Sequence, residues 1–132
     1  MIVLDASAAV SIFLNIGPQA SRIRQRIVQP EETLHVPQLF DVEVLHVLRR
    51  HSLSGALSEC RGRLALRRLS STRLTRYPHA TFVRRIWELR HNLTAYDAAY
   101  VALAETLEAP LLTTDRRLAQ APGIRAEVEL YR

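Results

Sequence analysis

Apolar residues along the chain occur either in short continuous runs or in longer stretches that repeat every three or four positions. Continuous runs are typical of buried strands, and the longer repeat is typical of helices that bury one face. The pattern predicts strands at 2–4, 33–37, 72–77, 111–114 and near 126–130. It predicts helices at 7–15, 19–28, 38–51, 55–69, 79–90 and 94–108, with a short helix before the last strand.

Strands that alternate with helical segments predict an α/β fold in which helices cover a mainly parallel central sheet. No linker or composition shift divides the 132 residues, so we expect a single domain spanning 1–132. In open sheets of this type, ligands bind outside the carboxyl ends of the strands. Asp5 and Asp115 each follow a strand-like run directly, so we expect the chemistry at that edge.

The stretch LTAYDAAYVALA, residues 93–104, raises a specific question because a carboxylate interrupts its apolar stripe. The residues of this stripe, which would face a core, are Leu93, Tyr96, Tyr100, Val101 and Ala104. Asp97 lies on the same stripe, between Leu93 and Val101. A carboxylate in that setting is costly unless it is paired, hydrogen-bonded or bound to a metal. One interpretation is structural, since Thr94 and Asp97 have the spacing of a capping box. The other is that Asp97 belongs to a functional site.

Three further acids occupy comparable settings. Asp5 and Asp115 end strands, and Glu43 faces an apolar side of the 38–51 helix, whereas Asp41 faces the opposite side and is expected to be solvated. Each acid alone has a structural explanation as a helix cap or an arginine partner. Together, carboxylates that converge on one crevice would repel one another unless cations compensated. Donor sets made only of oxygen favour Mg²⁺ or Mn²⁺, which can assist hydrolysis of a phosphodiester.

The charge balance narrows the choice of partner. A net charge of +5 suits a polyanion such as RNA or an acidic protein segment. All 18 Lys and Arg positions hold Arg, which excludes chemistry that needs a lysine. Nine arginines make the middle third basic, either as an RNA-binding surface or as the polar faces of helices. They are Arg61, Arg63, Arg67, Arg68, Arg73, Arg76, Arg84, Arg85 and Arg90.

The remaining composition favours a cytoplasmic protein with no membrane segment. No apolar run reaches the roughly 18 residues that span a bilayer. The N-terminus has no basic stretch of a secretory signal, and a single cysteine, Cys60, offers no internal disulfide. Phe82 and Trp87 lie within the basic segment, and we expect both in the core rather than as platforms for bases.

Four segments together resemble the acidic motifs of the PIN-domain ribonucleases, and most of all the VapC-type toxins of bacterial toxin–antitoxin pairs. They are MIVLDASAAV, the helix that carries Glu43, LTAYDAAYVALA and LLTTDRRLA. The resemblance spans nearly the whole chain and implies a PIN-like three-layer α/β/α fold. It also implies a Mg²⁺-dependent endoribonuclease. The acids that match the family's catalytic metal site are Asp5, Glu43, Asp97 and Asp115.

Five other positions match or depart from the family pattern. Ser7 and Thr113 match small hydroxyl residues that support the site, although ordinary capping and turn bonding would explain them as well. His46 stands where relatives often carry Asn, and either supports a site carboxylate or is a core histidine. Arg116 and Arg117 stand where many relatives carry an acid or an amide, and either contact RNA or an antitoxin or are solvated.

The resemblance further implies how the protein acts and with which partners. A metal-bound water would attack phosphorus in an RNA substrate, with tRNA or rRNA as the expected substrate class. A VapB-like antitoxin would block the site, and the toxin would form a homodimer. Two alternatives stay open. One is a catalytically degenerate PIN fold that only binds RNA or protein, and the other is an α/β phosphotransfer domain with Asp5 as nucleophile, although that class commonly needs a lysine.

Overall fold

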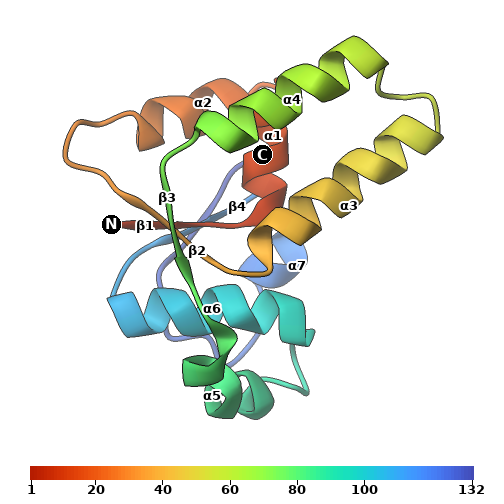
Figure 1. Ribbon diagram of the computed structural model, residues 1–132. Coiled ribbons are helices and arrows are strands. Elements are labelled where there is room, and N and C mark those ends of the chain that lie inside the picture. The colour runs from red at the N-terminus through yellow and green to blue at the C-terminus, as the bar shows by residue number, and fades with distance from the viewer.

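Five short strands form the central sheet of the computed structural model, which describes all 132 residues (Figure 1). The strands are β1 (Ile2–Leu4), β2 (Leu34–Pro37), β3 (Leu74–Tyr77), β4 (Leu111–Thr113) and β5 (Val128–Leu130). They lie in the order β3-β2-β1-β4-β5, and every neighbouring pair is parallel. The prediction of a mainly parallel sheet is therefore confirmed.

Helices cover both faces of this sheet. They are α1 (Ala6–Leu14), α2 (Gln19–Ile27), α3 (Phe40–Leu53), α4 (Glu59–Ser71), the 3₁₀-helix η1 (His79–Phe82), α5 (Val83–Glu88), α6 (Ala95–Leu107) and α7 (Arg116–Ala119). Figure 1 shows α5 and α6 on one face of the sheet and α1 to α4 on the other. Helix α6 contacts β1, β2 and β4, and α1 packs against α2, α3 and α4. The predicted three-layer α/β/α architecture is confirmed.

Most elements match their predicted ranges to within two residues at each end. The helix expected over 55–69 begins later, because the Ser58 side chain accepts a hydrogen bond from the backbone N–H of Arg61 and caps α4 there. The helix expected over 79–90 is divided into η1 and α5. None of the helices is both long enough and apolar enough to cross a membrane.

The core lies on both faces of the central strands, which explains their continuous apolar sequences. Ile2, Val3 and Leu4 of β1 are completely buried. Helix α6 approaches the sheet closely because its inner face carries small side chains such as Ala98 and Ala102, both buried. Close packing over the sheet fixes the direction of α6, and therefore also the place at which its N-terminal turn projects past the strand ends.

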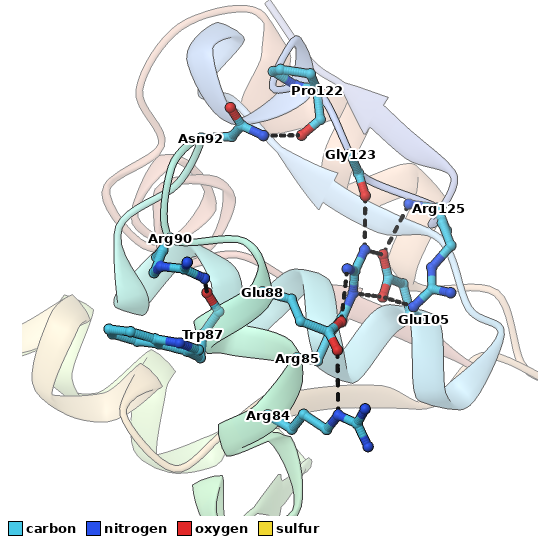
Figure 2. Close-up of polar contacts among 10 residues, drawn as sticks. All are labelled: Arg84, Arg85, Trp87, Glu88, Arg90, Asn92, Glu105, Pro122, Gly123 and Arg125. Carbon is cyan, nitrogen blue, oxygen red and sulfur yellow. Dashed lines mark hydrogen bonds and ion pairs between the residues drawn. The ribbon is translucent and has the colours of Figure 1, made fainter.

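An ion-pair network joins α5 and the segment before β5 to α6, as Figure 2 shows. Arg85 donates to both carboxylate oxygens of Glu105, with N···O distances of 2.7 and 3.0 Å, and to the carbonyl of Gly123 at 2.7 Å. The backbone N–H of Arg125 also donates to Glu105, at 2.9 Å. Burial acts to raise the pKa of Glu105, but hydrogen bonds from Arg85 and Arg125 lower it overall. The pair therefore holds three segments of the chain together.

Candidate active site

The order of the strands places two acids side by side. Strand β1 lies between β2 and β4. After β1 the chain adds β2 and β3 on one side of it, and then crosses over to add β4 and β5 on the other side. Such a switch point leaves a crevice outside the carboxyl ends of the strands. Asp5 follows β1 directly, and Asp115 lies two residues beyond β4. Both acids therefore reach the same crevice from adjacent strands.

A cavity of about 580 Å³ opens at this point. Its lining includes all four acids predicted from the sequence, together with two of the predicted supporting residues: Asp5, Ser7, Glu43, His46, Asp97 and Asp115. A larger cavity of about 780 Å³ lies beside the pair of Arg85 and Glu105. Its arginines are paired with Glu88 and Glu105, whereas the acids of the smaller cavity have no such partners, so the chemistry is assigned to the smaller, acid-lined cavity.

Asp5 is the most deeply buried of these acids, with 5% of its surface exposed. Ser7 Oγ and Thr113 Oγ1 both donate to Asp5 Oδ2, the latter at 2.8 Å. The two hydroxyls in turn accept from the backbone N–H groups of Thr114 and Asp115, at 3.1 and 3.0 Å. Burial raises the pKa of Asp5, and these hydroxyl bonds offset part of that rise. Ser7 and Thr113 therefore both hold Asp5, and Thr113 also forms the local turn bond to Asp115 that the structural interpretation predicted.

Glu43 projects from α3 and is held by a buried tyrosine. The hydroxyl of Tyr100, whose side chain is completely buried, donates to Glu43 Oε2 at 2.7 Å. Burial raises the pKa of Glu43 to about 6; the bond from Tyr100 opposes this rise, and the charges of Asp5 and Asp97 add to it. Burial and the Glu43 charge raise the pKa of Tyr100, so the phenol remains a proton donor. The sequence suggested Tyr100 only as part of an apolar stripe.

Asp97 and Asp115 combine a structural role with a place in the cavity. Thr94 Oγ1 accepts from the backbone N–H of Asp97 at 3.2 Å, so the predicted cap of α6 is confirmed. Asp115 Oδ1 accepts from the backbone N–H of Arg117 at 2.8 Å and caps α7. Burial raises the pKa of Asp97, and the nearby Asp115 charge raises it further. Capping and exposure to the cavity thus occur in the same residues.

None of the four cavity acids forms an ion pair, although six other acids of the chain are paired with arginine or the N-terminus. Unpaired like charges in a half-buried site raise one another's pKa, and a bound cation would reverse that effect. The donors are all oxygen, which suits Mg²⁺ or Mn²⁺. No three His, Cys, Asp or Glu side chains are grouped closely enough to hold a metal as they stand. The fit therefore rests on donor chemistry and charge.

Several predicted placements are corrected by the structure. His46 is exposed and lines the cavity, so the interpretation as a core histidine is wrong. Asp41 is not simply solvated, because Arg76 donates to both of its oxygens at 2.6 and 2.8 Å and lowers its pKa. Phe82 is buried as expected, whereas Trp87 is 66% exposed. Whether a side chain on a helix is buried depends on the helices and strands packed against it, and the periodicity of the sequence does not show these neighbours.

Tyr96 also differs from its predicted place, since it is exposed rather than part of the apolar stripe. Arg116 and Arg117 are exposed beside the cavity. Most of the basic middle third is engaged within the chain, which favours a structural role for those arginines. Those that donate hydrogen bonds to other groups of the protein are Arg61, Arg63, Arg68, Arg76, Arg85 and Arg90. Arg84 forms an ion pair with Glu88.

The parallel sheet with an acid-lined cavity at its switch point defines an α/β protein with a candidate metal-dependent active site. Comparison with known proteins identifies its family. The PIN domain family model matches residues 2–124. The chain is 47% identical to Ribonuclease VapC1 of Mycobacterium tuberculosis, covering 98% of this chain and 97% of that protein. It is 42% identical to Ribonuclease VapC12 of the same organism, with 98% of each chain covered.

A solved structure agrees with this comparison at the level of the fold. It contains VapBC2 from Rickettsia felis bound to a DNA fragment from their promoter, and it superposes with a TM-score of 0.70 at 16% identity. The superposition covers 100% of both chains. The chain belongs to the PIN-domain family and, within it, to the VapC ribonucleases.

Proposed function

We propose that the protein is an endoribonuclease toxin that depends on Mg²⁺ or Mn²⁺. One observation carries the proposal: four carboxylates from separate elements line one cavity without a single arginine partner, in a chain whose net charge is +5. Such an arrangement costs stability unless it serves a cation. Relatives that match nearly the full chain are named as ribonucleases, which supports RNA as the substrate.

The residues that would hold the metal are Asp5, Glu43, Asp97 and Asp115. A divalent cation bound there supplies Lewis acidity toward the phosphodiester and lowers the pKa of water. Ser7 and Thr113 orient Asp5 by occupying Oδ2. Tyr100 occupies Oε2 of Glu43 and leaves Oε1 without a protein donor. Asp5 and Glu43 thus each keep an oxygen that can bind a cation or accept a proton.

Water, rather than a side chain, is the proposed nucleophile. The Ser7 hydroxyl donates to Asp5 and accepts from the backbone N–H of Thr114, so it is engaged in positioning. Asp5 is nearly buried, and the chain has no lysine to stabilise a phosphoryl group beside it. Both features disfavour the phosphotransfer alternative, in which Asp5 would attack phosphorus. His46, Arg116 and Arg117 border the acids and supply positive or polar groups for an RNA backbone.

We also propose a VapB-like antitoxin as the protein's partner. The solved neighbour from Rickettsia felis contains VapBC2, and the acid-lined cavity here is open to a basic side chain from such a partner. Occupation of the cavity would exclude cation and RNA together. In keeping with the family, we also propose that the protein is a single domain over 1–132, forms a homodimer, acts in the cytoplasm and cuts a tRNA or an rRNA.

The test is RNA cleavage by the protein purified free of any partner. Total cellular RNA is incubated with Mg²⁺, with Mn²⁺ or with EDTA, and the cut ends are mapped. Asp97→Asn is compared with Asp41→Asn, which removes an acid outside the cavity. Cuts that need metal, persist in Asp41→Asn and vanish in a folded Asp97→Asn variant support the nuclease. Equal behaviour of wild type and both variants would reject catalysis and favour a binding module.

A further inference from the structure

One exposed aromatic side chain lies in the acid-lined cavity without a structural partner. Of the three Phe, four Tyr and one Trp, only Tyr96 and Trp87 are mostly exposed, at 62% and 66%. The guanidinium of Arg90 lies 4.6 Å from the centroid of the Trp87 ring, and Figure 2 shows the two together. Tyr96 has no such neighbour, and its hydroxyl makes no hydrogen bond within the chain. Its ring is therefore available to something outside the protein.

Packing does not account for a tyrosine at this position. Tyr96 stands in the first turn of α6, and the neighbours that pack against the sheet, Ala98 and Tyr100, are buried. The cap of the helix comes from Thr94, so Tyr96 is not needed to start it either. It is adjacent in sequence to Asp97, and both residues line the same cavity.

An unpaired arginine lies on another wall of the cavity. Arg50 of α3 lines it, is exposed, and forms neither an ion pair nor a side-chain hydrogen bond. Several other arginines are paired with acids, as Arg76 is with Asp41 and Arg85 with Glu105. The cavity therefore combines a group of acids, a free guanidinium and a free aromatic ring. A ring and a cation beside a phosphodiester site match the alternation of base and phosphate in RNA.

We propose that Tyr96 and Arg50 form a substrate-binding rim, in which the Tyr96 ring stacks on a base beside the cleaved bond and Arg50 binds an adjacent phosphate. This inference rests on the proposed function and extends it to the form of the substrate. A side chain can stack on a base only where that base is unstacked from its neighbours. The RNA is therefore single-stranded at the cut, in a loop, a bulge or an open end.

Binding without cleavage tests the rim. An Asp5→Asn background prevents turnover, and fluorescence anisotropy follows a labelled oligouridine and an RNA duplex of the same length. Tyr96→Ala should weaken binding of the single strand by about 5- to 150-fold, the range expected for loss of one stacked base. Tyr96→Phe keeps the ring and should bind as the background does. Trp87→Ala, which removes the other exposed aromatic, is the matched control and should change little.

The salt dependence of binding isolates the contribution of the arginine. Loss of one phosphate contact should reduce the slope of log K against log salt by about 0.7 for a single strand. Arg50→Gln should show that reduction. Arg49→Gln should not, because Arg49 is exposed on the same helix but lines a different cavity. Circular dichroism confirms that each variant is folded.

Three results would overturn the rim: Tyr96→Ala binding as tightly as Trp87→Ala, Tyr96→Phe binding as weakly as Tyr96→Ala, or a preference for the duplex. Retained RNA affinity in Tyr96→Ala would mean that the ring serves a protein partner instead.

These failures of the rim can be distinguished from failure of the nuclease. If wild type cuts RNA while Tyr96→Ala binds normally, only the rim is wrong. If single strands bind through Tyr96 but wild type makes no cuts with any metal, the nuclease is wrong, and Tyr96 is an RNA-binding residue that does not serve cleavage.

Discussion

Replacement of Glu43 by Gln removes one charge from the cavity but keeps the shape of the side chain and an oxygen that can accept from Tyr100. The pKa of Glu43 is raised from 4.5 to about 6, chiefly by burial. At about 1.36 kcal/mol per unit this corresponds to roughly 2 kcal/mol, and solvent screening at a half-buried group reduces it to about 1 kcal/mol. Glu43→Gln should therefore stabilise the metal-free protein by about that amount at neutral pH.

The sign of this effect depends on pH. When the pKa of a carboxyl is higher in the folded than in the unfolded protein, the folded protein is more stable with that carboxyl protonated than with it ionised. That contribution is fully present below the unfolded value near 4.5 and is lost as pH rises through about 6. The stability gap between Glu43→Gln and wild type should therefore be small below pH 4.5, widen up to pH 6, and stay constant above it.

Urea and thermal unfolding in EDTA across this pH range measure the gap. For a domain of this size, about 1 kcal/mol corresponds to roughly 3–5 °C in Tm. Asp41→Asn on the same helix is the control of opposite sign, because hydrogen bonds from Arg76 lower the pKa of Asp41. It should lose stability at neutral pH and not at acid pH. A Glu43→Gln variant that is less stable than wild type at neutral pH, or whose stability gap is the same at every pH, would show that the buried charge of Glu43 does not destabilise the protein.

Three further predictions follow from single contacts. Tyr100→Phe removes the donor to Glu43 Oε2 and should weaken Mn²⁺ binding by about 10-fold or more while the fold is kept, measured by titration of the purified protein. Ser7→Ala should lower Mn²⁺ affinity in the same assay, because Asp5 loses one of its two hydroxyl donors. Arg85→Gln leaves Glu105 without its bidentate partner and should cost about 1–3 kcal/mol in urea unfolding, and no loss would show that the network in Figure 2 contributes nothing.

Local sequence patterns predict most of the helices and strands. Short apolar runs and three-to-four repeats located the strands and helices, since both depend on residues close together in the chain. Asp5 and Asp115 were found because each ends a strand, and parallel strands bring their carboxyl ends to one edge. Asp97 was found because a carboxylate in an apolar stripe needs an explanation. Each of these predictions depends on residues close together in the chain, and the regular arrangement of a parallel sheet then determines where those residues lie.

Features that depend on tertiary neighbours could not be read in this way. Tyr96 and Tyr100 occupy one nominal stripe, yet the first is 62% exposed and the second completely buried. The difference arises because the first turn of α6 lies beyond the packed part of the helix. Tyr100 therefore reaches Glu43, a partner distant in sequence, and Tyr96 reaches solvent. His46 likewise shares a side of α3 with Glu43 but lies where the cavity opens.

We infer that the four cavity acids together bind a divalent metal ion, and Mn²⁺ titration followed by electron paramagnetic resonance tests this binding without reference to activity. We expect saturable binding of Mn²⁺ to wild type. Binding should be weakened at least about 10-fold in Asp5→Asn and in Asp97→Asn, because loss of a metal ligand should cost no less than loss of a residue that supports one. Asp41→Asn, outside the cavity, should bind as wild type does. If wild type binds Mn²⁺ no better than a folded Asp5→Asn variant, the four acids do not form a metal site.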